Sequence, residues 1–180
     1  MNLRTNRPVT EMVISVDSLH MERTIQEDHD EFCALLLDPT VTKMNGRRVD
    51  VETLFQHYLK NIYSFSVFSD DSFVGLCSLF PTSLSSAFKS IKSLELVYSV
   101  VPLYWNKGVA TYSVNSICEL GFNEIGLDCI LSGCYTDNIP SSIVLRKTGF
   151  KEIFTREEMI SGSDRRESIY LKTGDRKSVV

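Results

Sequence analysis

LELVYSVVPLYWNKGVAT, residues 94–111, is the stretch of sequence that decides the fold of this chain. Its first part, Leu94–Val101, is apolar and rich in β-branched residues and ends at Pro102, which predicts a buried strand. After Gly108, small and apolar residues recur at helical spacing as far as Phe122, which predicts a helix over 109–122. A strand therefore feeds a short, glycine-containing turn that opens a helix.

The start of that helix is a candidate anion site. The first N–H groups of a helix lack partners within it, and the helix dipole adds partial positive charge there. Gly108 allows close approach of a ligand, and the small Ala110 keeps the first turn open. A glycine in a strand–turn–helix connection is also common without any ligand, so a purely structural turn is the alternative.

Short strands and amphipathic helices account for the rest of the chain. The expected strands are Met12–Val16, Leu19–Arg23, Tyr63–Ser69, Phe73–Phe80, Asp128–Tyr135, Lys151–Ile160 and Glu167–Leu171. The expected helices run from a capping box at residues 24–27 to Asp38-Pro39, from Asp50 through Leu59, and from Pro140 to Gly149. We expect one α/β domain over residues 1–180, with a core at about 12–172 and flexible ends.

Composition and charge narrow the class of protein. The chain has 180 residues, of which 43% are hydrophobic and 23% charged, as in globular domains. It has no apolar run of membrane-spanning length and no signal-peptide pattern, so we expect a cytoplasmic protein without a membrane partner. The net charge of −4 disfavours nucleic acid as a partner and suits a cationic amine.

Cysteine and histidine show no ligand spacing. The five cysteines are Cys33, Cys77, Cys118, Cys129 and Cys134. Most lie in apolar segments, which predicts reduced thiols in the core. The three histidines, at positions 20, 29 and 57, are scattered, so we expect no metal.

Two ordered motifs resemble those of the GNAT superfamily of acyl-CoA N-acyltransferases. NIPSSIVLRKTGF, residues 138–150, resembles the N-x-x-S-x-x-x-L-x-K-x-G-F signature, and Trp105–Ala110 resembles the pyrophosphate loop Q/R-x-x-G-x-G/A. VPLYWNKGVAT and LHMERTIQEDHDEFCALLLDPTV are similar to the branch that contains the ribosomal-protein N-terminal acetyltransferases. The resemblance extends from about Met12 to Leu171.

This resemblance implies a fold and an activity. The fold is a single GNAT-like α/β (α+β) domain with a mixed, mostly antiparallel sheet, splayed at the acetyl-CoA site and flanked by about four helices. The implied activity is direct transfer of an acetyl group from acetyl-CoA to a primary amine within a ternary complex, with a protein or peptide N-terminus favoured. A polyamine or drug acetyltransferase and a noncatalytic CoA-binding or interaction module are the alternatives. The oligomeric state, monomer or homodimer, is left open.

The family motifs also imply contacts with acetyl-CoA. They assign oxyanion binding to the backbone of Ser99, Val100 and Val101, pyrophosphate binding to Lys107, Gly108, Val109, Ala110 and Thr111, the pantetheine arm to Asn138, and the sulfur to Ser141. The chain departs from the family at Trp105, where Gln or Arg is usual, and at Asn106, where Gly is usual. The alternative to these ligand contacts is a structural role, with Asn138 as the cap of a helix and Ser141 as a residue of its first turn, but the full match to the signature favours the functional role.

The catalytic groups implied by the resemblance are Ser141, Glu158 and Glu95. Many relatives carry a tyrosine as the thiol proton donor where this chain has Leu145, so the role passes to Ser141. Glu158 matches the glutamate of the closing hairpin and is the first candidate for the base that deprotonates the amine, whereas Glu95 lies on the central strand. Each carboxylate is equally expected to be a solvated strand residue. We expect acceptor loops at Thr40–Arg48 and Pro81–Ser93.

Overall fold

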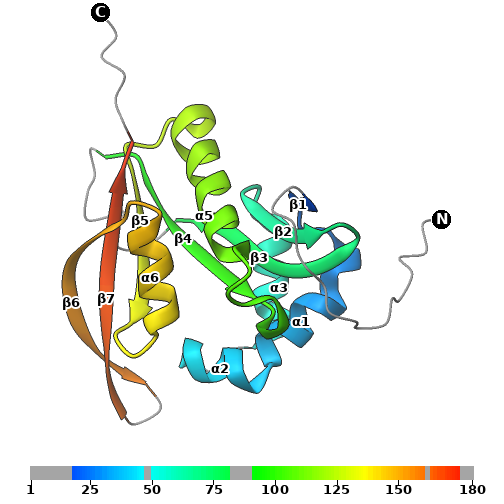
Figure 1. Cartoon of the computed structure of the whole chain (residues 1–180), viewed down its shortest axis with the longest axis horizontal. Helices are drawn as coiled ribbons and strands as arrows, with labels where there is room; N and C mark the ends of the chain where they lie inside the picture. Colours follow the sequence, from blue (N-terminus) through cyan, green and yellow to red (C-terminus); the bar gives the residue numbers. More distant parts are fainter. Residues whose placement is uncertain (1–17, 47–49, 82–90, 161–162, 175–180) are drawn as a thin grey trace, which may run out of the picture.

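The computed structural model describes residues 18–46, 50–81, 91–160 and 163–174, without the side chains of residues 158–160 and 163. In this part of the chain seven strands form one sheet in the order β1-β2-β3-β4-β5-β7-β6 (Figure 1). The strands are β1 (Leu19–Arg23), β2 (Ser64–Ser69), β3 (Ser72–Phe80), β4 (Ser93–Val100), β5 (Cys129–Tyr135), β6 (Lys151–Ile160) and β7 (Ser163–Thr173). All neighbours pair antiparallel except β4 and β5.

Helices cover both faces of this sheet. They are α1 (His29–Leu37), α2 (Pro39–Asn45), α3 (Val51–Lys60), α5 (Val109–Glu119) and α6 (Ile139–Lys147). Helices α1, α2 and α3 pack in one core cluster with Leu76 of β3. Helices α5 and α6 pack in a second cluster with Cys77 of the same strand and Leu96 of β4. Because successive strand residues point to opposite faces, β3 supplies side chains to both clusters.

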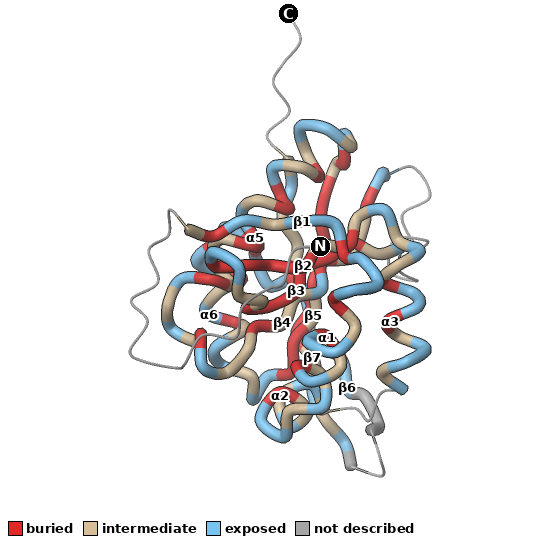
Figure 2. Tube along the Cα trace, turned by 90° about the vertical axis from the view of Figure 1, so that its right-hand side faces the viewer, coloured by how far each residue is buried: buried red, intermediate tan, exposed pale blue. Residues whose placement is uncertain are grey.

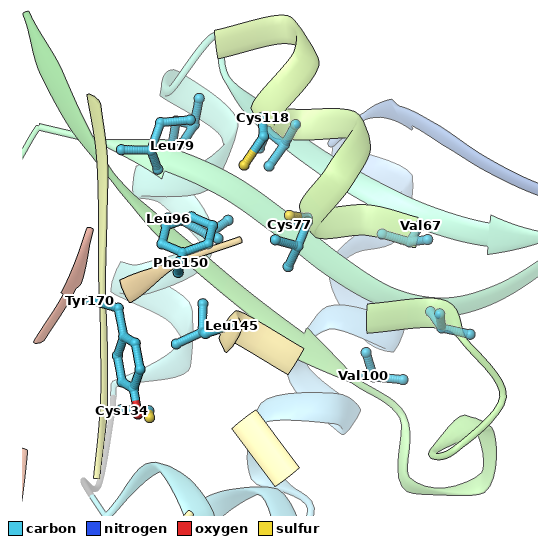
Figure 3. Packing of buried hydrophobic residues seen from close by; sticks show 14 of the residues in the cluster. Val67, Cys77, Leu79, Leu96, Val100, Cys118, Cys134, Leu145, Phe150 and Tyr170 are labelled. Carbon is cyan, nitrogen blue, oxygen red and sulfur yellow. The ribbon is translucent and has the colours of Figure 1, made fainter. Parts of the chain in front are cut away.

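The second cluster fills the centre of the molecule. Figure 3 shows Leu145 of α6 lying near Tyr170 of β7, with Leu96 and Phe150 above it, and Leu145 is fully buried. Figure 2 shows the same pattern along the chain, with buried segments through the central strands and exposed segments on the outer side of α3. The sheet thus lies between two helical layers, and its middle strands are enclosed on both faces.

The sheet opens between β4 and β5. These strands pair only from Ser93↔Cys129 to Glu95↔Leu131, although β4 continues to Val100 and β5 to Tyr135. Just past the last pair, the Ser132 hydroxyl donates to the Leu96 carbonyl at 3.1 Å. The two strands diverge beyond this point, and each leaves backbone groups along the opening.

The structure corrects one expected loop. Residues within Thr40–Arg48 form α2, because the Asp38 side chain accepts the N–H groups of Thr40 at 2.8 Å and Val41 at 3.2 Å and Pro39 occupies the first turn. Sequence reasoning took Asp38-Pro39 only as the end of the preceding helix. This additional helix makes five, against the four or so expected.

Smaller differences concern helix ends. The reciprocal cap before α1 joins the Ile25 backbone to Asp28, at 3.0 Å from Ile25 N to Asp28 Oδ2, rather than Thr24 to Glu27. The helix expected over 109–122 is α-helical to Glu119 and π-helical over Leu120–Ile125. The expected strand Met12–Val16 and residues 82–90 of an expected acceptor loop lie outside the described residues. Among the described helices, none combines the length and apolar character that crossing a membrane requires.

Candidate functional site

A cleft of about 590 Å³ lies where β4 separates from β5. Its walls come from α2, the end of β4, the turn before α5, the first turn of α5 and helix α6. Eight of the residues assigned to acetyl-CoA line it: Ser99, Val100, Gly108, Val109, Ala110, Thr111, Asn138 and Ser141. The volume is in the range of small-molecule sites. The structure therefore gathers residues from two separate motifs around one cavity.

The N-terminus of α5 presents unpaired backbone donors to this cleft. Gly108 is the N-cap in the left-handed conformation, with φ 85°, and no side chain caps the helix. The first intrahelical bond is from Tyr112 N to Gly108 O at 2.9 Å, so the N–H groups of residues 109–111 have no partner within the helix. A Cβ at Gly108 would meet nothing within 4 Å. This open end, with its helix dipole, suits a pyrophosphate.

One face of α6 forms an apolar wall of the cleft. Ile139 and Ile143, one turn apart, are 56% and 57% exposed, and both line the cavity together with Val144. Exposed isoleucines on the same helix face can pack against the aliphatic part of a bound ligand. Lys147 continues this face one turn further and also lines the cleft. Sequence reasoning did not single out these side chains.

Two of the assigned residues do not line the cleft. The Val101 N–H already donates to the Val74 carbonyl of β3 at 2.9 Å, so it is not free to bind an oxyanion. Because alternate N–H groups of a strand face opposite edges, the Val100 N–H faces β5 and the opening. The Val100 carbonyl accepts the Trp105 indole N–H at 2.7 Å, which fixes the end of β4 against the turn. The Lys107 ammonium lies 5.4 Å from the centre of the Tyr104 ring.

Ser141 also lines the cleft, from the first turn of α6. Asn138 caps this helix, since its Oδ1 accepts the Ser141 N–H at 3.2 Å, in agreement with the capping alternative. The Ser141 hydroxyl lies 2.8 Å from the Tyr98 hydroxyl of β4, which also reaches the Ser141 carbonyl at 3.3 Å. Sequence reasoning missed Tyr98. The available signal was the two-residue spacing of Leu96, Tyr98 and Val100. Residues at this spacing in a strand share one face of the sheet, here the face covered by α5 and α6.

Burial sets the protonation state of this pair. It raises the pKa of Tyr98 well above its usual value, although the hydrogen bond to Ser141 opposes the shift. Tyr98 is therefore protonated at neutral pH, and either hydroxyl can donate to the other. When Tyr98 donates to Ser141 Oγ, the serine hydroxyl proton can point to the cleft. Leu145, at the family's tyrosine position, is fully buried in the core. The tyrosine hydroxyl near Ser141 therefore comes from Tyr98 of β4, whereas the tyrosine of the family motif would lie on α6.

Of the two candidate bases, Glu95 is not among the described residues that line the cleft. Glu95 is half-buried at the last β4–β5 pair and lies on the opposite face of β4 from Tyr98. That face is the one covered by α1 and α3, since Glu95 pairs with Phe80 and Phe80 packs on Tyr58. Glu158 pairs with Arg165 in the β6–β7 hairpin, and its side chain is outside the described part of the chain.

Glu167 is a further carboxylate near the opening. It pairs with Tyr135 across β5 and β7, and only 15% of its side chain is exposed. Arg156 binds it through Nη2 at 2.6 Å and Nε at 2.7 Å. A Cβ at Gly133 would collide with its Oε1, so the glycine makes room for the carboxylate over β5. No local pattern in the sequence marks this placement, which depends on the β5–β7 register.

Arg165 joins the hairpin to the helical layer on this face. It binds Asp137 with two bonds of 2.8 Å and stacks on Tyr135, with Cζ 4.2 Å from the ring centre. It also reaches the Lys43 carbonyl of α2 at 3.5 Å. The end of α2 therefore lies beside β5 and β7.

A sheet that splays beside an uncapped helix N-terminus defines an α/β domain with a site for an elongated, anionic cofactor. The Acetyltransferase (GNAT) domain family matches residues 19–151. Since this match covers most of the chain, the protein belongs to the GNAT acetyltransferase family.

Similar proteins differ in their acceptors. An uncharacterised N-acetyltransferase of Bacillus subtilis, YnaD, is 39% identical over 57 residues, which is 32% of this chain and 34% of that protein, so the alignment spans about a third of each. The ribosomal-protein-S5-alanine acetyltransferase of Vibrio fischeri has a TM-score of 0.75 at 16% identity, covering 92% of this chain and 98% of its own. Spermidine N-acetyltransferase of Vibrio cholerae, in complex with CoA and spermine, has a TM-score of 0.74 at 17% identity, covering 87% and 96%. These structural similarities establish the fold.

Proposed function

We propose that this protein transfers the acetyl group of acetyl-CoA directly to a primary amine. The observation that carries the proposal is that one cleft is lined both by the N-terminus of α5, whose first N–H groups have no partner within the helix, and by the Ser141–Tyr98 hydroxyl pair. The pyrophosphate binds residues 108–111, the pantetheine arm lies along Ile139 and Ile143, and the thioester reaches the opening of the sheet. The end of β4 then places the Val100 N–H beside the reacting carbonyl.

The chemistry follows from these groups. The neutral amine nitrogen attacks the thioester carbon, and the carbonyl electron pair moves to oxygen, where the Val100 N–H stabilises the charge. Collapse of this intermediate re-forms the carbonyl and breaks the C–S bond, and the electron pair leaves on sulfur. The products are the amide and the CoA thiol, so one proton moves in total from nitrogen to sulfur.

Ser141 and Tyr98 stabilise the departing thiolate by hydrogen bonding. A thiol has a pKa of about 8.5, whereas burial keeps the pKa of Tyr98 above its ordinary value. Full proton transfer from this pair to the thiolate is therefore unfavourable. Ser141 donates to the sulfur, Tyr98 orients Ser141, and the proton that completes the thiol comes from the acetylated amine.

A buried thiol on β5 favours direct transfer over a cysteine acyl-enzyme. Burial raises the pKa of Cys134, and the residue is only 7% exposed. The nucleophilic form of cysteine is the thiolate, so Cys134 is a poor acceptor for the acetyl group at neutral pH. Acetyl-CoA and the amine then need to be bound together.

We favour a peptide or protein N-terminus as the acceptor. The resemblance of the motifs to the ribosomal-protein branch supports this choice. An α-amino group has a pKa near 8, so about a tenth is neutral at pH 7, whereas a lysine side chain is almost entirely charged. A carboxylate base deprotonates the part of the amine that is still charged, with Glu158 as the first candidate and Glu95 as the second.

The test is one acetyl-transfer screen with the purified chain. Peptides with free N-termini, lysine peptides with blocked N-termini, and spermidine are compared at equal concentration by CoA release and product mass. We expect kcat/KM for free N-termini to exceed that for the other classes by at least tenfold. A preference for spermidine would instead assign a small amine. Acetyl-CoA binding by calorimetry without transfer to any class would contradict enzymatic activity and indicate a binding module.

A further inference from the structure

Three potential metal ligands meet on two helices outside the acetyl-CoA cleft. His29 and Cys33 lie one turn apart on α1, and Glu52 lies in the first turn of α3. The His29 Nε2 is 2.9 Å from Glu52 Oε2 and 3.6 Å from Cys33 Sγ. All three ligand atoms lie within 4.8 Å of one another. None of the three residues lines the cleft.

We propose that His29, Cys33 and Glu52 form a site for Zn²⁺ or a similar borderline-soft divalent cation. Imidazole nitrogen, thiolate sulfur and carboxylate oxygen are the three ligand types that zinc uses in proteins. These three side chains supply one ligand each, and water completes a four-coordinate shell. The spacing of four between His29 and Cys33 puts them on one face of the helix that the sequence predicts, whereas the third ligand, Glu52, comes from α3 and only the tertiary structure brings it to them.

The distances from His29 Nε2 to the other two ligand atoms suit a tetrahedral ion. Zinc lies about 2.3 Å from sulfur and about 2.0–2.1 Å from nitrogen, so a tetrahedral angle separates these ligands by about 3.6 Å. The separation of His29 Nε2 and Cys33 Sγ is 3.6 Å. Nitrogen and oxygen ligands need about 3.3 Å, so the Glu52 carboxylate must retreat by a few tenths of an ångström from its 2.9 Å contact. Its side chain is 63% exposed and free to do so.

A neighbouring carboxylate already orients the imidazole for this role. Asp30 Oδ1 lies 3.0 Å from His29 Nδ1, so that nitrogen carries a proton and Nε2 is left to bind metal. Histidines that bind metal usually donate their second N–H to a carboxylate in this way. The ring also packs edge-on against Phe55, with centroids 4.9 Å apart, which restricts its rotation.

The charges around the cluster attract a cation. Asp30 Oδ1 and Glu52 Oε2 lie 3.0 and 2.9 Å from the two ring nitrogens of His29, so carboxylates flank the imidazole on both sides. Zn²⁺ binds the deprotonated imidazole nitrogen and thiolate, so its affinity rises with pH.

A bound ion would cross-link α1 to α3. Helix α1 leads directly through Asp38 into α2, whose residues Val41 and Met44 line the cleft. The cross-link therefore stabilises the layer from which α2 extends, without placing metal at the reacting atoms. We expect the melting temperature to rise when Zn²⁺ is added, because the ion binds the folded pair of helices and not the unfolded chain.

The experiment uses the full chain, freed of metal with a chelator, and Zn²⁺ and Co²⁺ as the probes. We expect one equivalent of Zn²⁺ by calorimetry, with Kd below about 10 μM, and a thiolate-to-cobalt charge-transfer band in the near ultraviolet. Zn²⁺ should also protect Cys33 from alkylation by iodoacetamide. Absence of binding below millimolar Zn²⁺, or of the thiolate band, would overturn the proposal.

Variants assign the ligands. C33S and H29Q should each weaken Zn²⁺ binding at least tenfold, and D30N about tenfold through the orientation of His29. The matched control is H20Q, since His20 also lies beside a carboxylate, with Nε2 3.5 Å from Glu22 Oε1. It should bind Zn²⁺ as the parent chain does. Undiminished binding in C33S, or equal loss in H20Q, would place the ion elsewhere, provided circular dichroism shows each variant folded.

Discussion

The hydroxyl groups of Tyr98 and Ser141 lie 2.8 Å apart and join strand β4 to helix α6 across 43 residues of sequence. Tyr98 and Ser141 both line the cleft. In the function we propose, the strand of Tyr98 also carries the oxyanion donor and Ser141 binds the leaving sulfur, so this bond would fix the distance between the groups that act on the two ends of the scissile C–S bond. Loss of either hydroxyl should affect the chemical step more than cofactor binding.

Replacement of Tyr98 by phenylalanine should lower kcat about tenfold, because Ser141 loses its orienting donor. The Kd for acetyl-CoA should change less than threefold, and stability to urea should fall by about 1 kcal/mol for the lost hydrogen bond. S141A should lower kcat further than Y98F. The double variant should resemble S141A, since Tyr98 acts through Ser141. Additive losses in this cycle would show that the two hydroxyls act independently.

Replacement of Gly108 by glutamate should weaken acetyl-CoA binding at least tenfold, about 1.4 kcal/mol. The new side chain would lie in open space where we propose that the pyrophosphate binds, and it would add a like charge there. The control is G126E, because Gly126 has a similar φ of 71° but lies far from the cleft residues in sequence and does not line it. Both variants carry the strain of a positive φ, so only G108E should lose affinity in calorimetry.

Glu158→Gln should lower kcat/KM for an N-terminal peptide about a hundredfold at pH 7, the lower range for loss of a general base. The deficit should shrink as pH rises toward 9, because the α-amino group then loses its proton without help. Glu95→Gln should cost less, mainly through weaker acceptor binding. Rate profiles over pH 6 to 9 for both variants provide the measurement.

The pH dependence separates the alternatives for the base. A loss in E158Q that does not vary with pH would show an orienting role for Glu158. A pH-dependent deficit in E95Q alone would place the base on β4. E167Q serves as the comparison, since Glu167 is bound to Arg156 and its loss should change acceptor affinity or stability without altering the pH profile.

Alkaline pH should destabilise the fold from about pH 9 upward. Burial raises the pKa of the Cys118 thiol to about 11, and it raises the pKa of Cys77 as well. At a pH below the pKa of these thiols in the unfolded chain, burial of the neutral thiols contributes fully to the free energy of unfolding. As pH rises, the unfolded chain ionises first, so stability falls until the folded thiols also ionise.

Because burial raises the pKa of Cys118 to about 11, this thiol alone should lower the free energy of unfolding by about 2 kcal/mol by pH 11. Urea unfolding between pH 8 and 10.5 measures it. C118A should lower stability at pH 8 through a small cavity and should also lose stability less steeply above pH 9. The control C33A removes the half-buried thiol on α1 and should keep most of the slope. An unchanged slope in C118A would show that this thiol does not titrate as its burial implies.

Local sequence determined the elements that carry the cofactor site. The strand before Pro102, the glycine turn and the helix from Val109 follow from periodicity and turn chemistry, which act over a few residues. The caps at Asp50 and Asn138 follow from the same short-range hydrogen bonding. Helix α2 escaped prediction because Asp38-Pro39 ends one helix and caps the next, and sequence reasoning assigned it only the first role.

Tertiary structure alone decided which side chains meet. Tyr98 contacts Ser141, Glu167 lies over Gly133, and His29 contacts Glu52. The two residues of each pair come from different elements, and no local pattern in the sequence encodes how those elements pair or pack. The splay of β4 from β5 has the same origin, since it depends on where two strands far apart in sequence stop pairing. Local hydrogen bonds and hydrophobic periodicity fix the elements, whereas long-range packing of the two core clusters fixes the distances between their functional groups.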